Sequence, residues 1–370
     1  MNRSLSTVAA VLRTADGPFT IEEVDLDGPA DDEAVVRVAG VGFCHTDVLP
    51  RTPVVRPPVI AGHEGAGVVE SVGSAVTGLA PGDHVVLSFD SCGTCDSCLA
   101  ARPAYCHTFW PRNMSGFRAG RPTNIRDSAG APVQGRWFRQ SSFATRAVVP
   151  ARNAIKVDPD LPLEILGPLS CGVLTGAGSV FTSLAVAPGS SIAVFGAGAV
   201  GLSAVMAAKV AGAATIVAVD VLPERLALAE DLGATHVLDG RGGEVARRVR
   251  EIAPTGMDRA LDTTGVPEVS STAIDVLAVG GVCGLVGTPR GDLTIRPEQL
   301  GVGRSIVGIL VGDAVPQRLI PRLIELWRQG RFPFDRLITT YPLSKINEAE
   351  HDMLSGATVK PVLLPMEETR

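Results

Sequence analysis

A short apolar segment that runs directly into a glycine turn limits most strongly what this chain can fold into. Residues 191–195 precede the pattern G-x-G-x-x-G at 196–201, and a helix-like run follows. A second apolar segment, 215–219, ends at Asp220, nineteen residues after the third glycine. Together these parts form the full βαβ context of a nicotinamide or flavin dinucleotide site. The alternative is a glycine-rich turn in an ordinary α/β unit.

Each part of this motif has a physical role in holding a dinucleotide. The glycines allow the backbone to approach a pyrophosphate, which rests on the N-terminus of the following helix. Asp220 would bind the ribose hydroxyls of the adenosine and would repel a 2′-phosphate. The motif therefore favours NAD over NADP.

Strand-like and helix-like segments continue to alternate after this unit. We predict strands at 191–195, 215–219, 236–238, 260–262, 281–286 and 306–311, with helices between them. Six strands separated by helices fit a doubly wound parallel sheet of the Rossmann kind. Cys283 lies inside one of these apolar segments, and we expect it to be a buried structural thiol.

The first 155 residues or so have a different pattern. Short segments with partial alternation lie at 8–13, 19–25 and 33–39 and are separated by Asp-Gly-Pro turns. This pattern is typical of a β-rich unit. A polar excursion follows between Asn113 and Gln140, with Trp137 and Phe138 near its end.

A chain of 370 residues is too long for one ordinary core, so we expect two domains. Two strand-like segments near the end, 337–343 and 359–364, look as if they return to the first domain. We therefore predict a β-rich domain made of 1–172 and 314–370. The parallel-sheet domain would be 173–313.

Three residues from distant parts of the chain have the chemistry of a catalytic zinc site. Cys44 opens the run Cys-His-Thr-Asp at 44–47, His63 stands beside Glu64, and Cys171 lies in a run rich in Gly, Ser and Leu. A catalytic zinc needs three protein ligands from this set of residue types and a fourth position open to water or substrate. Cys44, His63 and Cys171 supply those ligands.

Four further cysteines have the spacing C-x2-C-x2-C-x7-C, which is typical of a closed tetrahedral zinc site. They are Cys92, Cys95, Cys98 and Cys106. An iron–sulfur site is the competitor, but the bacterial ferredoxin run has C-x3-C-P for its fourth ligand. Four unligated loop thiols would be open to oxidation. We predict a structural zinc here, without His107 as a ligand.

Charge and hydropathy exclude several classes of partner. The net charge of -6 gives no reason to expect nucleic acid, which calls for basic patches. No N-terminal run has the layout of a signal peptide, and the most apolar stretch, 194–210, is dense in Gly and Ala. We expect a cytoplasmic protein in which most of the seven cysteines bind metal.

On these residues the chain resembles the zinc-dependent medium-chain alcohol dehydrogenases over essentially its whole length. The matching parts are 44–47, 62–65, the four-cysteine run, Cys171, the glycine motif and Asp220. Within that family it is most similar to aryl-alcohol (benzyl-alcohol) dehydrogenases, with geraniol dehydrogenases close by, through 140–145, 166–172 and 331–337. The resemblance implies a Rossmann cofactor domain and a GroES-like catalytic domain.

The resemblance also implies roles for individual residues. Thr46 would hydrogen-bond the substrate alcohol and pass its proton towards the cofactor ribose, and His45 would approach the cofactor pyrophosphate. Asp47 and Glu64 would not bind the zinc themselves but would orient its ligands and tune the metal. Many relatives end the proton relay at a histidine where this chain has Leu49. The cofactor-binding residues that we expect are His45, Thr175, Gly196, Gly198, Val200, Gly201, Asp220 and Arg225.

We therefore expect an NAD-dependent enzyme with two zinc ions per chain that interconverts primary aromatic or allylic alcohols and their aldehydes. A geraniol-type or general alcohol dehydrogenase, a thiol-adduct-dependent formaldehyde dehydrogenase or a polyol dehydrogenase are alternatives with the same fold. The polyol enzymes commonly have Glu where Cys171 stands. A non-catalytic regulatory nucleotide-binding protein is the alternative from another class. We expect no membrane partner and a homodimer or homotetramer.

Overall fold

The computed structural model describes residues 4–116 and 125–366 and divides into two compact units. The first comprises Met1–Cys171, Pro316–Pro321 and Asp335–Arg370, and the second Gly172–Val315 and Arg322–Phe334. These boundaries lie within a few residues of the predicted ones, except that Arg322–Phe334 groups with the second unit. In that segment Trp327 packs its ring 5.5 Å from the ring of Phe334.

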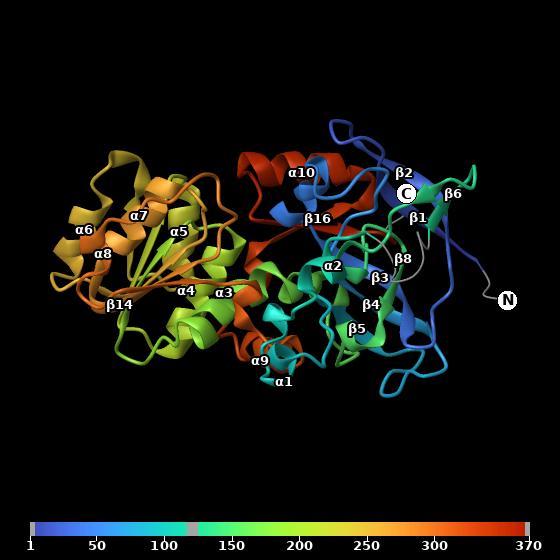
Figure 1. Cartoon of the computed structure of the whole chain (residues 1–370), viewed down its shortest axis with the longest axis horizontal. Coiled ribbons are helices and arrows are strands. Elements are labelled where there is room, and N and C mark those ends of the chain that lie inside the picture. The colour runs from blue at the N-terminus through green and yellow to red at the C-terminus, as the bar shows by residue number, and fades with distance from the viewer. Residues whose placement is uncertain (1–3, 117–124, 367–370) are drawn as a thin grey trace. The chain divides into compact units, whose positions relative to one another are not determined.

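The second unit contains a six-stranded sheet in which every pairing is parallel (Figure 1). Across the sheet the strands are β12 (His236–Asp239), β11 (Thr215–Asp220), β10 (Ser191–Phe195), β13 (Met257–Asp262), β14 (Leu277–Leu285) and β15 (Ser305–Gly308). Counted along the chain, this order is 3-2-1-4-5-6, the doubly wound order of dinucleotide-binding sheets. The prediction of a doubly wound parallel sheet is confirmed.

The helices of this unit begin and end at the signals that the sequence provides. They are α3 (Gly172–Gly178), α4 (Ala199–Ala211), α5 (Pro223–Leu232), α6 (Val245–Ile252), α7 (Pro267–Asp275), α8 (Pro297–Leu300) and most of α9 (Pro316–Arg328). Helix α4 stops at Gly212, whose φ of 83° gives the left-handed cap that favours glycine. Proline occupies the first turn of α5 and α7, where its missing N–H has no helical partner.

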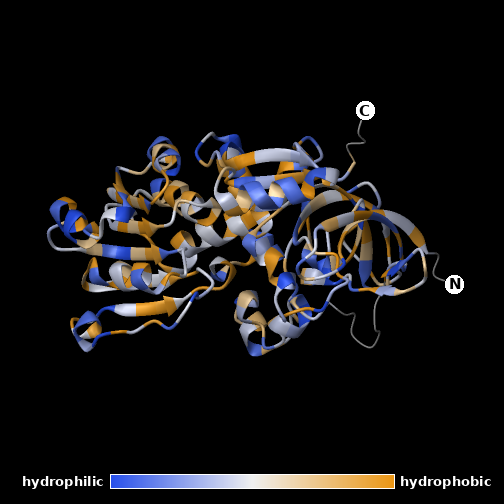
Figure 2. Ribbon diagram, turned by 90° about the horizontal axis from the view of Figure 1, so that it is seen from above, coloured by the Kyte–Doolittle hydropathy of each residue, from blue (hydrophilic) through white to orange (hydrophobic). Residues whose placement is uncertain are grey.

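The core of the second unit is aliphatic. Phe195, Val217, Leu277 and Cys283 are among its buried members, and Cys283 has no solvent exposure. Hydrophobic residues recur along the strands because helices cover both faces of such a sheet (Figure 2). The prediction that Cys283 is a buried thiol is confirmed.

The first unit is built from two sheets. A seven-stranded sheet contains β16 (Ile338–Pro342), β17 (Lys360–Leu364), β3 (Glu33–Gly42), β4 (Glu64–Val72), β5 (His84–Leu87) and β9 (Ala154–Val157), with β8 (Arg146–Pro150) paired to β3. A four-stranded sheet contains β1 (Leu5–Leu12), β2 (Phe19–Leu26), β6 (Ile125–Asp127) and β7 (Pro132–Val133). The first unit also contains the short helices α1 (Asp96–Leu99), α2 (Phe109–Asn113) and α10 (Ile346–Ser355). The late strand β17 pairs with β3, so the chain does return to the first unit.

The polar excursion predicted at 113–140 is partly regular structure. Strand β6 pairs with β2, so that Ile125 lies opposite Leu26, and β7 extends the same sheet. Ile125 and Val133 are buried, which explains why so polar a stretch still adds strands. Residues 117–124 of the excursion lie outside the described part of the chain. None of the helices in the described ranges has the length and hydrophobicity of a membrane span.

Candidate metal centres and nucleotide site

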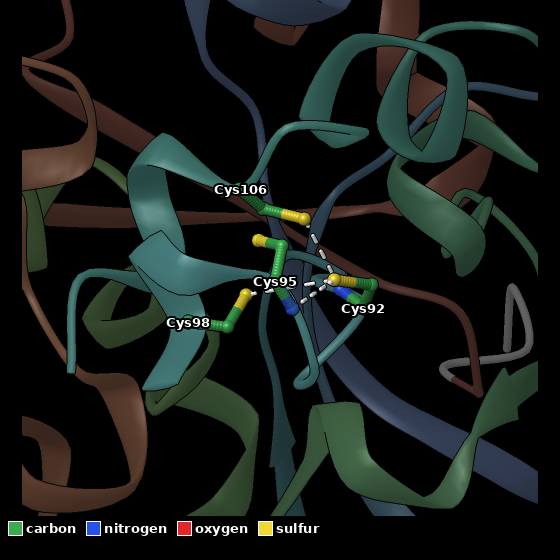
Figure 3. A group of neighbouring side chains, drawn as sticks. All are labelled: Cys92, Cys95, Cys98 and Cys106. Carbon is green, nitrogen blue, oxygen red and sulfur yellow. Dashed lines mark hydrogen bonds between the residues drawn. The ribbon is translucent and has the colours of Figure 1, made fainter. Parts of the chain in front are cut away.

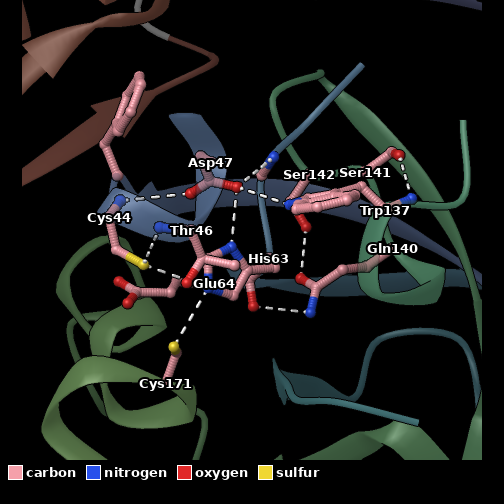
Figure 4. Close-up of polar contacts among 12 residues, drawn as sticks. Cys44, Thr46, Asp47, His63, Glu64, Trp137, Gln140, Ser141, Ser142 and Cys171 are labelled. Carbon is pink, nitrogen blue, oxygen red and sulfur yellow. Dashed lines mark hydrogen bonds and ion pairs between the residues drawn. The ribbon is translucent and has the colours of Figure 1, made fainter. Parts of the chain in front are cut away.

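The three predicted zinc ligands meet within the first unit (Figure 4). Cys44 follows β3, His63 directly precedes β4, and Cys171 follows the 3-10 turn Gly167–Ser170. His63 Nε2 lies 3.4 Å from the Sγ of Cys44 and 3.1 Å from the Sγ of Cys171. Antiparallel pairing of β3 with β4 brings the first two ligands together, with Gly42 opposite Glu64.

The imidazole of His63 is oriented by Asp47. His63 Nδ1 lies 2.8 Å from Asp47 Oδ1, and both side chains are buried. An ionised carboxylate only accepts hydrogen bonds, so Nδ1 carries the proton and Nε2 is left free to bind metal. This carboxylate–histidine pair is the usual support for a metal-binding imidazole.

A buried ion pair ties Glu64 to the end of the chain. Lys360 on β17 places Nζ 2.9 Å and 3.0 Å from the two carboxylate oxygens of Glu64, and it also donates to the carbonyl oxygen of Phe43. Burial opposes the charged form of Lys360, but the charges of Glu64, Cys44 and Cys171 together outweigh it and raise the pKa of the lysine. The sequence prediction missed Lys360, because nothing local marks it as a partner of a residue so far away.

The backbone of His63 is held by a loop at 137–142. Gln140 donates from Nε2 to the carbonyl oxygen of His63 at 2.8 Å and accepts from the N–H of Gly65 at 3.1 Å. Phe138 lays its ring 4.6 Å from the imidazole. Phe138, Arg139 and Ser141 have positive φ angles of 47°, 59° and 48°, which typically cost about 1–3 kcal/mol each. The surrounding contacts therefore hold this loop in a strained form beside the ligand.

The two thiols of this centre behave as a pair. A hydrogen bond with Cys171 lowers the pKa of Cys44 well below that of a free thiol, and the neighbouring His63 adds to the effect. The same hydrogen bond, together with burial, raises the pKa of Cys171. Two sulfurs and one imidazole nitrogen, supported by a buried carboxylate, suit Zn²⁺ with an open fourth position. The residues present therefore fit a catalytic zinc.

The second predicted metal set also comes together (Figure 3). The Sγ atoms of Cys92, Cys95, Cys98 and Cys106 all lie within 4.8 Å of one another. Backbone N–H groups of Thr94 and Cys95 point at the Sγ of Cys92, at 3.5 Å and 3.3 Å, and lower its pKa to about 5. Four sulfurs without an open position suit a closed structural zinc site. His107 is exposed and stands outside the group.

Two family models and several known proteins match this chain. The model of the alcohol dehydrogenase GroES-like domain matches residues 30–159, and that of the zinc-binding dehydrogenase domain matches residues 199–328. Geraniol dehydrogenase from Castellaniella defragrans is 46% identical over 365 residues, which cover 97% of this chain and 98% of the relative. The chain belongs to the zinc-dependent alcohol dehydrogenase family.

Solved structures agree with this assignment over the whole chain. An alcohol dehydrogenase zinc-binding domain protein from Burkholderia ambifaria has a TM-score of 0.96 at 50% identity, covering 98% of this chain and 100% of the other. Benzyl alcohol dehydrogenase from Acinetobacter calcoaceticus has a TM-score of 0.93 at 40% identity, covering 97% and 99%. The predictions of the family, the fold class and a zinc enzyme are confirmed, and NAD is the nucleotide expected for this family.

The glycine motif of this alcohol dehydrogenase has the geometry that a pyrophosphate site needs. Gly196 has a φ of 90°, in the left-handed region, and follows β10 directly. A Cβ on Gly201 would lie 1.7 Å from the carbonyl oxygen of Gly196, so only glycine fits there. A Cβ on Gly198 would meet nothing within 4 Å, so the side at which a phosphate would approach is open. Val200 lies in the first turn of α4.

The acid at the end of β11 is fixed by backbone donors. Asp220 accepts from the N–H groups of Ala197 at 2.5 Å, Val221 at 2.7 Å and Leu222 at 2.9 Å. Arg225 in α5 is buried, and burial lowers its pKa against the opposing effect of the nearby Asp220 carboxylate. Thr175 lies buried in α3, within the same unit. These residues are the part of the predicted cofactor set that the second unit carries.

His45 and Thr46 form the first turn of the 3-10 helix His45–Arg51, immediately after Cys44. His45 is exposed and Thr46 half-buried, and the N–H of Thr46 donates to the Sγ of Cys44 at 3.4 Å. Trp137 is fully buried, and its indole N–H donates to Asp47 at 3.1 Å.

Proposed function

We propose that this alcohol dehydrogenase transfers hydride between NAD and primary alcohols with an aromatic or allylic carbinol. The aromatic surroundings of His63 carry the proposal. The ring of Phe138 lies 4.6 Å from the imidazole and 6.4 Å from the ring of Phe109, which in turn lies 5.6 Å from Phe89. Apolar side chains beside the metal ligands favour a ring or a prenyl chain over a small polar substrate.

The similar proteins support the same substrate class. The Castellaniella relative is named geraniol dehydrogenase, an enzyme of an allylic alcohol, and the Acinetobacter structure is a benzyl alcohol dehydrogenase. Both cover nearly all of this chain. Conjugation stabilises an aromatic or allylic aldehyde, so one active site can serve both kinds of alcohol.

The bound zinc and the residues near it would each have a separate role in the reaction. When bound, zinc acts as a Lewis acid that lowers the pKa of an alcohol hydroxyl. Thr46 would hydrogen-bond the substrate hydroxyl and would pass its proton towards the ribose of bound NAD. By its likeness to the family, His45 would approach the pyrophosphate of bound NAD. Because Leu49 stands where many relatives have a histidine, the relay would end at the ribose, at water or at another group.

Asp47 and Glu64 act on the ligands rather than on the substrate. Asp47 fixes the Nδ1–H tautomer of His63. Glu64, neutralised by Lys360, adds a fixed dipole beside the two sulfurs and the imidazole. In the other unit, Gly196, Gly198, Val200, Gly201, Thr175, Asp220 and Arg225 bind NAD, and Asp220 selects it over NADP.

A kinetic series of ethanol, hexanol, benzyl alcohol and geraniol, followed by cofactor reduction at 340 nm, tests the proposal. Each buried methylene equivalent contributes about 0.8 kcal/mol, and every 1.4 kcal/mol or so is tenfold in kcat/KM. We expect benzyl alcohol and geraniol to exceed ethanol by about two orders of magnitude or more. If ethanol equals or exceeds benzyl alcohol, the chain is a general alcohol dehydrogenase.

The same assays separate the remaining alternatives. A formaldehyde dehydrogenase of the thiol-adduct kind would turn over only when a thiol is added with formaldehyde. A geraniol-type enzyme would prefer geraniol over benzyl alcohol by a wide margin. A non-catalytic regulatory protein would reduce no cofactor with any alcohol.

We also propose a cytoplasmic homodimer or homotetramer. All seven cysteines lie in the described ranges and none of them is in a disulfide there, which suits a reducing compartment. Light scattering after gel filtration gives the oligomer size, and a mass of one chain would contradict the proposal.

A further inference from the structure

The carboxylate that orients His63 is itself held by an indole. Asp47 Oδ1 accepts from the N–H of Gly62 at 2.9 Å, from His63 Nδ1 at 2.8 Å and from Trp137 Nε1 at 3.1 Å (Figure 4). Both the carboxylate and the indole ring are fully buried. Of these three donors, only Trp137 reaches Asp47 from a distant part of the chain, ninety residues away.

The segment that carries Trp137 is anchored on both sides of the ring. Arg136 is buried, pairs with Glu33 at 3.1 Å and donates to the carbonyl oxygen of Val148 at 3.0 Å. The N–H of Trp137 donates to Ser141 Oγ at 3.0 Å, and this hydroxyl donates to the carbonyl oxygen of Ile60 at 2.6 Å. Strained residues follow at 138, 139 and 141. So many fixed contacts leave the indole little freedom to turn away from Asp47.

We propose that Trp137 is a positioning residue for the catalytic zinc, acting through Asp47 on the orientation of His63. Three side chains are linked in series: the indole N–H of Trp137 donates to Asp47, and the carboxylate of Asp47 accepts from Nδ1–H of His63. Nε2 of the same imidazole lies close to the Sγ atoms of Cys44 and Cys171. Removal of the indole donor leaves Asp47 one donor short in a buried site. The carboxylate then keeps the backbone donors of Cys44 and Gly62, but it can shift on the side that the indole held, and the imidazole with it.

The test replaces Trp137 with phenylalanine, which keeps an aromatic ring and removes the N–H. The matched control is Trp110→Phe, because Trp110 is an exposed residue of α2, 59% accessible, and takes no part in the contacts described above. Zinc release to a chelator is followed in the full-length holoenzyme, where the structural zinc serves as an internal reference. The absorption spectrum of Co²⁺ placed in the catalytic site reports the ligand geometry independently of turnover.

Trp137→Phe is expected to release the catalytic zinc about tenfold faster, since such supporting partners typically change metal affinity 10- to 100-fold. The structural zinc should leave at the unaltered rate, the cobalt spectrum should shift, and kcat should fall with little change in KM. Trp110→Phe should match the unaltered enzyme in every measurement. A variant with 3-benzothienylalanine at 137, which keeps the size of indole but has no N–H, should reproduce the effect.

Equal release of both zincs in Trp137→Phe and the unaltered enzyme, with an unchanged cobalt spectrum, would overturn the proposal. Faster loss of both zincs would overturn it as well, because it indicates a general loss of packing. A benzothienylalanine variant that behaves like the unaltered enzyme would do the same. Of these measurements, only kcat and KM rest on the proposed function. If no alcohol is oxidised, the proposed function fails, while zinc release and the cobalt spectrum still decide the role of Trp137.

Discussion

Lys360 and Glu64 form a buried ion pair across 296 residues of sequence, with Nζ 2.9 Å and 3.0 Å from the two carboxylate oxygens. It joins the last strand of the first unit, β17, to the first residue of β4. His63 immediately precedes that strand, so the C-terminal segment helps to hold the metal ligand in place. Burial alone raises the pKa of Glu64, and the charge of Lys360 counters that effect.

Loss of Lys360 should therefore destabilise the first unit. Lys360→Met leaves the carboxylate of Glu64 buried without its cation, which typically costs about 3–5 kcal/mol. We expect a clear fall in the thermal unfolding midpoint, measured by calorimetry. The double variant Lys360→Met with Glu64→Gln should recover much of the loss, because no buried charge remains. A single variant as stable as the unaltered enzyme would show that the ion pair contributes little.

Cofactor choice should depend on Asp220. The carboxylate is fixed by three backbone N–H groups at the end of β11, and Arg225 is the nearby cation. Asp220→Ser removes the charge that repels a 2′-phosphate, so kcat/KM with NADP should rise by about tenfold, or ~1.4 kcal/mol. Glu230→Gln, at an exposed position of α5, is the control. Equal or better turnover with NADP in the unaltered enzyme would contradict this assignment.

Cys283 should resist alkylation in the folded protein. Burial raises its pKa to about 12, and the thiolate is the reactive form. After removal of both zincs with a chelator at pH 8, iodoacetamide should label the six cysteines of the two metal centres and spare Cys283. Mass spectrometry of peptides checks this, with a denatured sample as the reference. Labelling of Cys283 at the same rate as the others would show that the second unit opens readily.

The sequence predicted those features that depend on short-range pattern. Alternating strands and helices, with the glycine motif after β10, predicted the parallel sheet, and the spacing of Cys92 to Cys106 predicted the structural zinc set. Cys44, His63 and Cys171 were found because few other residues offer the same ligand chemistry.

The remaining features depend on contacts that leave no local mark in the sequence. Gln140 and Trp137 lie in a loop where Phe138, Arg139 and Ser141 have positive φ angles, which no residue type there suggests. Lys360 is one basic residue among 33, and only the pairing of β17 with β3 brings it to Glu64. Strand β6 was missed because its three residues alternate too briefly to be distinguished from a loop.

The structural zinc centre should be needed for folding rather than for chemistry. Its four thiols lie in a lobe with short helices, and Cys95 directly precedes α1. Cys95→Ala should give a protein that is largely insoluble or unfolds many degrees earlier, since a structural zinc contributes folding free energy directly. Soluble yield and the unfolding midpoint measure this. A stable Cys95→Ala enzyme with two zincs would contradict the assignment.

Metal analysis of the purified enzyme together with Cys44→Ala tests the central claim most directly. Cys44, His63 and Cys171 form one ligand set and the four cysteines form another, so active enzyme should contain two zinc ions per chain. Cys44→Ala should stay folded, hold one zinc and show no turnover with benzyl alcohol. Fewer than two zincs in fully active enzyme, or turnover by Cys44→Ala at the unaltered rate, would contradict the account.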